Sequence, residues 1–166
     1  DVSCILHRSG FAHLHGENTR EAVRAARNAG CYGIETDVRE TSDGVIAVVH
    51  DRTVATSGQE IDITTITFDE LTHRMRDLGK PEPMQLEDVC QEAAGALSLM
   101  VDVKVGSHSS SYHERIRALL ESYSVLDSAM IIGDQGAKAT IGHYARAAVS
   151  LAELHAFGDS SHQYHP

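Results

Sequence analysis

Short apolar runs alternate along the chain with stretches in which apolar residues recur every three or four positions. The short runs suit β-strands, and the stretches between them have the periodicity of helices that bury one face. We expect about six strands, at residues 2–6, 34–39, 45–49, 97–105, 130–132 and 147–151. Most of these runs are continuously apolar, which is typical of parallel strands that are buried on both faces.

Helices are expected between most of these strands. Asn18 and Glu21 have the spacing of a capping box, and Gly30 ends the apolar stripe that follows them. A second capping box, at Thr67 and Glu70, predicts a short helix within the otherwise irregular segment 51–80. Further helices are expected at residues 85–94, 112–123 and 136–146. This alternation of strands and helices favours a parallel α/β sheet.

The segment from Gly33 to Asp51 has an unusual pattern of polar residues. Glu35 and Asp37 are two positions apart in a predicted strand, so their side chains project from the same face. A turn at residues 42–44 leads to the next apolar run, which ends at His50. Burial of carboxylates without partners is costly. The pair therefore indicates a metal site.

Polar residues also end two other predicted strands. His7 and Arg8 follow the first strand, and Asp102 and Lys104 lie near the end of the strand at 97–105. Parallel α/β folds build their sites at the carboxyl ends of strands, so we expect these side chains to converge on the first carboxylate pair. Three carboxylates would suit Mg²⁺, Ca²⁺ or Mn²⁺. The alternative is that they are surface charges or pair with the two cations.

Length and composition narrow the class of protein. The chain has 166 residues and is 42% hydrophobic, which fits one soluble globular domain. We place this domain at residues 1–154 and a polar tail at residues 155–166. The net charge of −10 disfavours nucleic acid as a partner. We expect no transmembrane segment, and the compartment stays open between the cytoplasm and the periplasm or extracellular space. Cys4, Cys31 and Cys90 are expected to be buried apolar residues rather than disulfides.

Five pieces of the sequence together resemble the glycerophosphodiester phosphodiesterase family. In chain order they are the HR of LHRSG, then ENT, GIETDVRETSDGVIAVVHD, PMQLEDV and VDVK, within residues 5–104. The resemblance implies a TIM (β/α)₈ barrel that hydrolyses glycerophosphodiesters to glycerol 3-phosphate and an alcohol. It also implies a divalent cation, Mg²⁺ or Ca²⁺ with Mn²⁺ as a third option. In this family the glycerol hydroxyl beside the phosphate is thought to be the nucleophile.

The resemblance assigns roles to individual residues. The matched positions are His7 and His50 as catalytic histidines, Glu35, Asp37 and Asp102 as metal ligands, and Arg8, Glu17, Asn18 and Lys104 as substrate-binding residues. Two imidazoles beside a phosphodiester can act as general base and general acid. The metal would bind a phosphate oxygen and the attacking hydroxyl, while the cations would hold the phosphate.

Three positions depart from the family's pattern, and the chain is short. Ser9 replaces a glycine, Gly16 replaces a proline, and Asp102 stands where glutamate is more common. A complete barrel needs about 250 residues. We therefore expect an incomplete barrel with exposed strand edges, through which the chain could self-associate.

Two other functions remain open. A non-catalytic relative could bind a phosphodiester or a partner protein, and a lysophospholipase D-type enzyme could use the same metal and histidines. An apolar groove at the mouth of the barrel would favour the lipid substrate, and a small polar pocket would oppose it. Among the other histidines, His13 and His15 lie on a loop that could cover the site. His108 and His113 have no spacing that predicts a role.

Overall fold

The fold is described from a computed structural model, which covers residues 5–10, 16–56 and 58–147. His13, His15, the polar tail at 155–166 and most of the strand expected at 147–151 lie outside the described residues.

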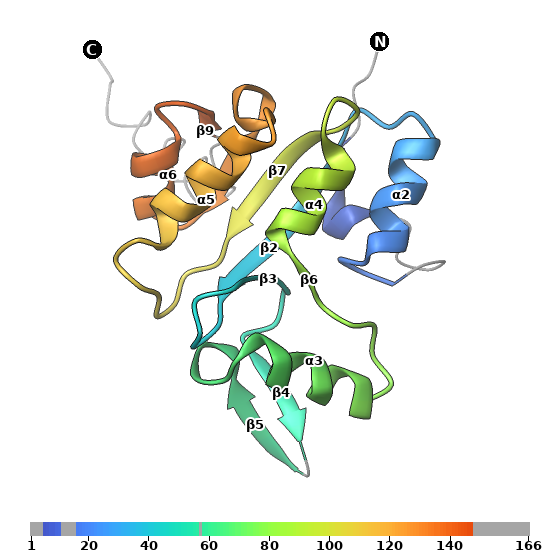
Figure 1. Cartoon of the computed structure of the whole chain (residues 1–166), viewed down its shortest axis with the longest axis vertical. Helices are drawn as coiled ribbons and strands as arrows, with labels where there is room; N and C mark the ends of the chain where they lie inside the picture. The colour runs from blue at the N-terminus through green and yellow to red at the C-terminus, as the bar shows by residue number, and fades with distance from the viewer. Residues whose placement is uncertain (1–4, 11–15, 57, 148–166) are drawn as a thin grey trace, which may run out of the picture.

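Five parallel strands form the centre of the molecule (Figure 1). They are β1 (Ile5–Leu6), β2 (Gly33–Glu40), β7 (Ser98–Val103), β8 (Met130–Gly133) and β9 (Arg146–Ala147). Each strand pairs in parallel with the next one along the chain, in the spatial order β1-β2-β7-β8-β9. Within the described residues, β1 pairs only with β2 and β9 only with β8. The sheet is therefore open, as expected for an incomplete barrel.

The strand that follows β2 is antiparallel to it, so the expectation of a parallel strand at 45–49 is wrong. β3 (Ile46–Val48) pairs with the end of β2, and β6 (Met84–Gln85) pairs with β3, both in antiparallel fashion. The turn between β2 and β3 is too short for the crossover that parallel strands need. The apolar run of β3 has another cause: Ile46 and Val48 join the main core, whereas Ala47 joins a second, smaller core.

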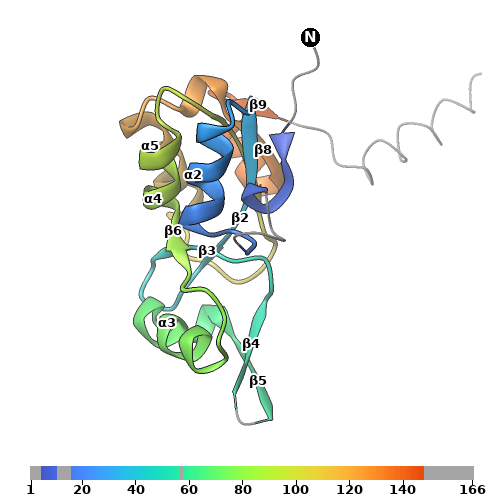
Figure 2. The same ribbon diagram turned by 90° about the vertical axis from the view of Figure 1, so that its right-hand side faces the viewer.

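Four helices cover one face of the sheet. They are α2 (Arg20–Asn28), α4 (Leu86–Ala93), α5 (Tyr112–Ser122) and α6 (Gln135–Ile141). Figure 2 shows three of them, α2, α4 and α5, side by side. Ile34 and Val38 of β2 and Val101 of β7 point into the core beneath them and are fully buried. α6 is shorter than the helix expected at 136–146, because the chain must turn after Ile141 to place Arg146 beside Met130 of β8.

The segment expected to be irregular, residues 51–80, folds into a small unit beside the barrel strands (Figure 1). It contains β4 (Thr53–Thr56), β5 (Gln59–Asp62), the 3-10 turn η2 (Ile63–Thr65) and α3 (Phe68–Asp77). β4 and β5 form a separate two-stranded antiparallel sheet. Thr67 caps α3 as predicted, since its hydroxyl accepts from the Glu70 N–H at 3.2 Å. Apolar residues of this segment pack with Val49 in the second core.

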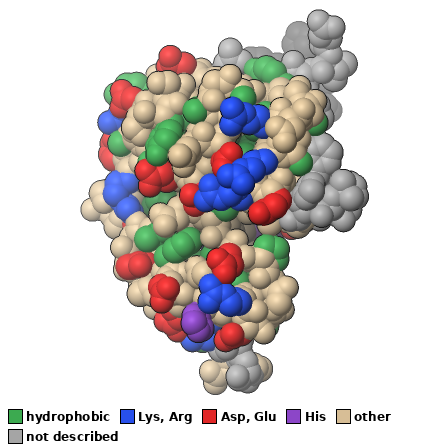
Figure 3. Space-filling view, turned by 45° about the vertical axis from the view of Figure 1, so that its right-hand side comes forward, with side chains coloured by type: hydrophobic (Ala, Val, Ile, Leu, Met, Phe, Trp, Pro, Cys, Tyr) green, Lys and Arg blue, Asp and Glu red, His purple; other side chains and the backbone are tan. Residues whose placement is uncertain are grey.

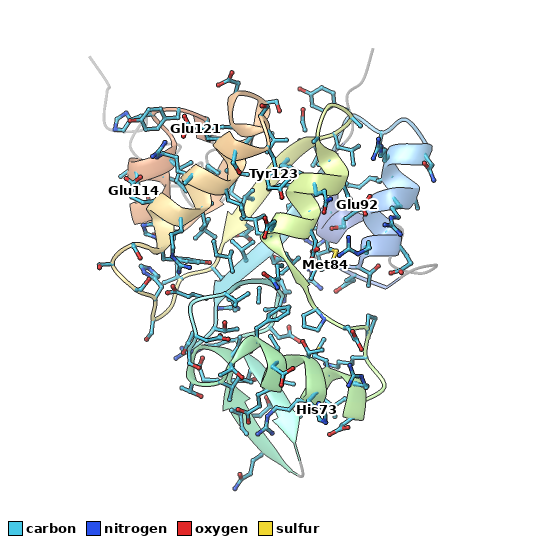
Figure 4. The ribbon with its side chains drawn as sticks, in the orientation of Figure 1. His73, Met84, Glu92, Glu114, Glu121 and Tyr123 are labelled. Carbon is cyan, nitrogen blue, oxygen red and sulfur yellow. The ribbon has the colours of Figure 1, made fainter. Side chains whose placement is uncertain are left out.

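Ion pairs connect neighbouring helices on the surface. Arg20 and Arg24 of α2 contact Asp88 and Glu92 of α4, and Glu92 lies on the side of α4 that faces α2 (Figure 4). Figure 3 shows basic and acidic side chains intermingled on this side of the molecule. In the described residues no helix is long and apolar enough to cross a membrane.

Candidate active site and metal centre

Three carboxylates meet at the carboxyl end of the central parallel strands. Glu35 and Asp37 belong to β2 and Asp102 to β7, and the register of the two strands places Asp37 directly beside Asp102. One oxygen of each carboxylate lies within 4.8 Å of one from each of the others. The structure therefore brings together the three residues that the sequence assigned to one metal.

Burial makes this cluster electrostatically strained. Glu35 is 5% exposed, and burial raises its pKa above the ordinary glutamate value, with the charges of Asp37 and Asp102 adding to the effect. A hydrogen bond from the Arg8 backbone N–H acts in the opposite direction. Carboxylate oxygens are the ligands that hard divalent cations prefer. The donor set and its repulsion thus fit the cation that the sequence predicts.

Lys104 neutralises part of this charge. Its Nζ lies 2.7 Å from Asp37 Oδ1 and 2.6 Å from Asp102 Oδ2. Burial alone would lower the pKa of Lys104, but its hydrogen bonds and ion pairs with the two aspartates raise it overall. The ammonium group therefore stays charged at the cluster, where a phosphate could contact it.

His7 and Arg8 reach the cluster from a tight turn after β1. The 3-10 turn η1 (His7–Ser9) places the Arg8 N–H 2.7 Å from Glu35 Oε2 and His7 Nε2 3.9 Å from the same oxygen. The His7 side chain is 75% exposed and accessible to a ligand. Ser9 has φ 63, a left-handed conformation that glycine adopts without strain. That requirement accounts for the glycine expected at this position.

Glu17 and Asn18 join the site through side-chain contacts. Arg8 Nη1 lies 2.6 Å from Glu17 Oε2, and Asn18 Nδ2 donates to Asp37 Oδ2 at 2.9 Å. The prediction that Asn18 caps the following helix is wrong. Thr19 is the cap, and its hydroxyl accepts from the Ala22 N–H at 3.2 Å. Asn18 lies outside the helix because its side chain is directed to Asp37.

His50 reaches the site on the chain that returns through β3, rather than at the end of a parallel strand. Its carbonyl oxygen accepts two hydrogen bonds from Arg39, at 3.1 Å from Nε and 2.9 Å from Nη2. Its Nδ1 lies 3.0 Å from Asp51 Oδ1, and this hydrogen bond lowers the pKa of Asp51. Arg39 was not among the site residues predicted from the sequence. Its position in the alternation of β2, on the same face as Glu35 and Asp37, was the available signal.

A cavity of about 280 Å³ lies between this site and the segment 51–80. Four of the predicted site residues line it, namely Arg8, Glu17, Asn18 and His50, whereas His7, Lys104 and the three carboxylates do not. Val54, Ile63 and Met75 supply an apolar part of its wall. Gly16 also lines it and has φ 80, which the family's proline could not adopt.

Comparisons with known proteins agree with the resemblance seen in the sequence. Human glycerophosphodiester phosphodiesterase 1 is 32% identical over an alignment of 120 residues, and the match covers 66% of this chain and 36% of the human protein. The chain thus spans about a third of the length of this curated relative.

Solved structures share the fold. The glycerophosphoryl diester phosphodiesterase domain of a Mycobacterium tuberculosis protein superposes with a TM-score of 0.75 at 17% identity, covering 99% of this chain and 66% of that one. An Oleispira antarctica phosphodiesterase, solved in complex with the product sn-glycerol-3-phosphate, gives 0.62 at 16% identity and covers 95% and 71%. The predicted incomplete TIM-type barrel is confirmed.

The family assignment rests on most of the chain. The profile of the "Glycerophosphoryl diester phosphodiesterase family" matches residues 7–150, a range that contains every predicted site residue. The chain belongs to the glycerophosphoryl diester phosphodiesterase family.

Proposed function

We propose that the chain hydrolyses glycerophosphodiesters to glycerol 3-phosphate and an alcohol, with a divalent cation and two histidines. The observation that carries this proposal is the convergence of Glu35, Asp37 and Asp102 within 4.8 Å, with Lys104 in contact with two of them. A site built only to bind a phosphate would use cations, and three carboxylates, two of them buried, would repel it.

Glu35, Asp37 and Asp102 would hold the cation. When bound, it would supply Lewis-acid polarisation of a phosphate oxygen and lower the pKa of a coordinated hydroxyl. Lys104 now occupies the space between Asp37 and Asp102. Once the charge of these carboxylates is neutralised, Lys104 is free to contact a phosphate oxygen. Mg²⁺ and Ca²⁺ both suit an all-oxygen site.

The two histidines would move the protons of the reaction. The side chains of both are accessible, at 75% exposure for His7 and 39% for His50. Asp51 holds Nδ1 of His50, which leaves Nε2 for proton transfer. Arg39 fixes the main chain at His50 and so limits where this ring can point.

The cavity beside His50 suits a small alcohol group. Its volume of about 280 Å³ is below the range of roughly 300–1,000 Å³ typical of pockets for drug-sized ligands. Its apolar wall, which includes Val54, Ile63 and Met75, favours the lysophospholipid alternative instead. We therefore rank glycerophosphocholine-like substrates first and lysophospholipids second.

Hydrolysis of glycerophosphocholine, followed by release of glycerol 3-phosphate, tests the proposal. We expect turnover with Mg²⁺ or Ca²⁺ and none after chelation. His7→Ala and His50→Ala should each lose about 10²–10⁴-fold in kcat, the usual contribution of acid-base groups. Faster turnover of lysophosphatidylcholine than of glycerophosphocholine would reverse the ranking of substrates.

His73→Ala is the matched control for both histidine variants. His73 is exposed on α3, in the small unit formed by residues 51–80 (Figure 4). This variant should keep the full rate. A folded, metal-loaded chain with no turnover on either substrate would contradict the enzymatic proposal and favour a binding role.

A further inference from the structure

A second group of potential metal ligands lies away from the three carboxylates. His108 is in the loop between β7 and α5, His113 is in the first turn of α5, and Asp134 directly follows β8. One ligand atom of each lies within 4.8 Å of one from each of the others. Two imidazoles and one carboxylate form a different donor set from the all-oxygen cluster, and they suit a borderline cation such as Zn²⁺.

The contacts of His108 orient its ring as they would for a metal ligand. Nδ1 lies 3.2 Å from the Ser109 carbonyl oxygen, which can accept a hydrogen bond from it. That bond leaves Nε2 as a free acceptor, the arrangement usual for metal-bound histidine. The ring is also stacked on Tyr112, with centroids 5.1 Å apart. These two contacts restrict the rotamers of His108 before any ligand binds.

His113 offers a nitrogen that lacks a hydrogen bond. Within the described part of the chain, its Nε2 is buried and has no hydrogen-bond partner, although Asp134 Oδ1 lies 3.3 Å away. Gly136 permits the close packing, because a Cβ there would lie 2.8 Å from His113 Cε1. An unpaired buried ring nitrogen is costly, and a cation would relieve that cost.

Asp134 already has a structural role that a metal would not disturb. Its Oδ1 accepts from the Ala137 N–H at 3.0 Å and so caps α6. A carboxylate has two oxygens, so it can cap the helix and bind a cation at the same time. We propose that His108, His113 and Asp134 form a second metal site, which takes Zn²⁺ and leaves one coordination position open.

Such a site would join two neighbouring parts of the barrel rim. His108 lies on the loop that begins at Lys104, and Asp134 lies at the start of α6, which packs beside α5 (Figure 1). The same loop is attached to β2 by Ser109, whose hydroxyl donates to Glu40 at 2.8 Å. Zn²⁺ would add a second attachment, from the loop to α6. It would therefore order the loop that follows Lys104 without taking part in phosphodiester chemistry.

Zinc titration of the purified chain by calorimetry tests this proposal. The titration is run in millimolar Mg²⁺, so that the hard cation occupies the three-carboxylate cluster. We expect one Zn²⁺ site that weakens at least about tenfold in His108→Ala, because removing a ligand should cost no less than removing an outer-shell partner. His113→Gln should weaken it similarly. Hydrogen exchange of residues 104–111 should slow on addition of Zn²⁺ in the wild type but not, at the same Zn²⁺ concentration, in His108→Ala.

Three controls make the outcome specific. His73→Ala removes another exposed histidine and should bind Zn²⁺ like the wild type. His108 is exposed, so its loss should not unfold the chain, and circular dichroism checks this. Equal Zn²⁺ affinity in the wild type and His108→Ala would overturn the proposal, as would loss of the site in Glu35→Gln instead. Zn²⁺ binding is measured without substrate. The second metal site is therefore tested independently of the proposed hydrolysis, and its test can succeed even if the chain hydrolyses no phosphodiester.

Discussion

Glu35 illustrates how a single buried group can be unfavourable alone and useful with a ligand. It is 5% exposed and shares its surroundings with Asp37 and Asp102. Burial and these two charges raise its pKa, so the ionised form is the costly one in the folded chain. A divalent cation bound there would convert that cost into binding free energy. The residue thus links folding stability to metal binding.

Replacement of Glu35 by glutamine should stabilise the metal-free chain at neutral pH. The pKa of Glu35 is higher in the folded state than in the unfolded state. The protonated side chain therefore contributes its full stability below the unfolded-state pKa, and this contribution is lost as the pH rises through the folded-state pKa. In chelator, Tm of Glu35→Gln should therefore exceed that of the wild type at pH 7–8, and the gain should vanish as the pH falls towards 4.5, the ordinary pKa of a glutamate side chain. Scanning calorimetry across this pH range measures it.

Bound metal should reverse this order of stability, so that the wild type becomes more stable than Glu35→Gln. A ligand at about 100 times its Kd stabilises the folded state by about 2.7 kcal/mol, and we expect Mg²⁺ or Ca²⁺ to do so for the wild type more than for Glu35→Gln. Glu121→Gln is the control, since Glu121 is an exposed carboxylate on α5 (Figure 4). A pH-independent difference in Tm between Glu35→Gln and the wild type would contradict the role of burial.

At the residue scale, the sequence predicted which side chains converge but not how each is held. Alternation in β2 was enough to pair Glu35 with Asp37, because side chains in a strand follow a fixed period. The prediction that Asn18 caps a helix was wrong, since its side chain contacts Asp37, a residue distant in sequence. His108 and Asp134 are brought together by the packing of α5 against α6. Their separation along the chain therefore has no characteristic value from which the grouping could be predicted.

At the scale of elements, the segment 51–80 has a core of its own. Leu71 of α3 is fully buried and packs in the second core with Val54, Ile63 and Val49. The helix was predictable from its cap at Thr67. The hairpin of β4 and β5 was not, because β5 (Gln59–Asp62) has no buried residue and so shows no alternation of apolar and polar positions.

Leu71→Ala should loosen this segment and leave the main core intact. Leucine-to-alanine changes at buried sites cost about 2–5 kcal/mol, and here the cavity would form in the smaller core. Hydrogen exchange should accelerate in β4 and α3, while amides of α4 stay protected. Leu120→Ala, at a fully buried position of the main core, should show the opposite pattern. Equal acceleration in both regions by Leu71→Ala would mean that the two cores unfold together.

At the scale of the whole molecule, the open sheet is the main departure from a complete barrel. Chain length predicted it, because eight strands and their helices need about 250 residues. The ends of the sheet can be compared with the sequence prediction only in part, because β1 and β9 are each described over two residues beside segments that are not described. The parallel neighbours beyond β1 and β9 are missing from the described residues.

Open sheet edges favour association, and charge opposes it. Within the described residues the barrel sheet ends at β1 and β9, and the end of an open sheet can present backbone groups to a second chain, so we expect self-association at the ends of the sheet. The net charge of −10 repels like copies, and raising the salt from about 0.01 M to about 1 M shortens the Debye length from about 30 Å to about 3 Å. Sedimentation velocity should therefore show a mass near 18.0 kDa at low salt and a larger average mass at high salt. A monomer at all salt concentrations, up to about 1 M, would show that these edges are protected. If the mass falls as salt is added, the contact is held by ion pairs instead of strand pairing.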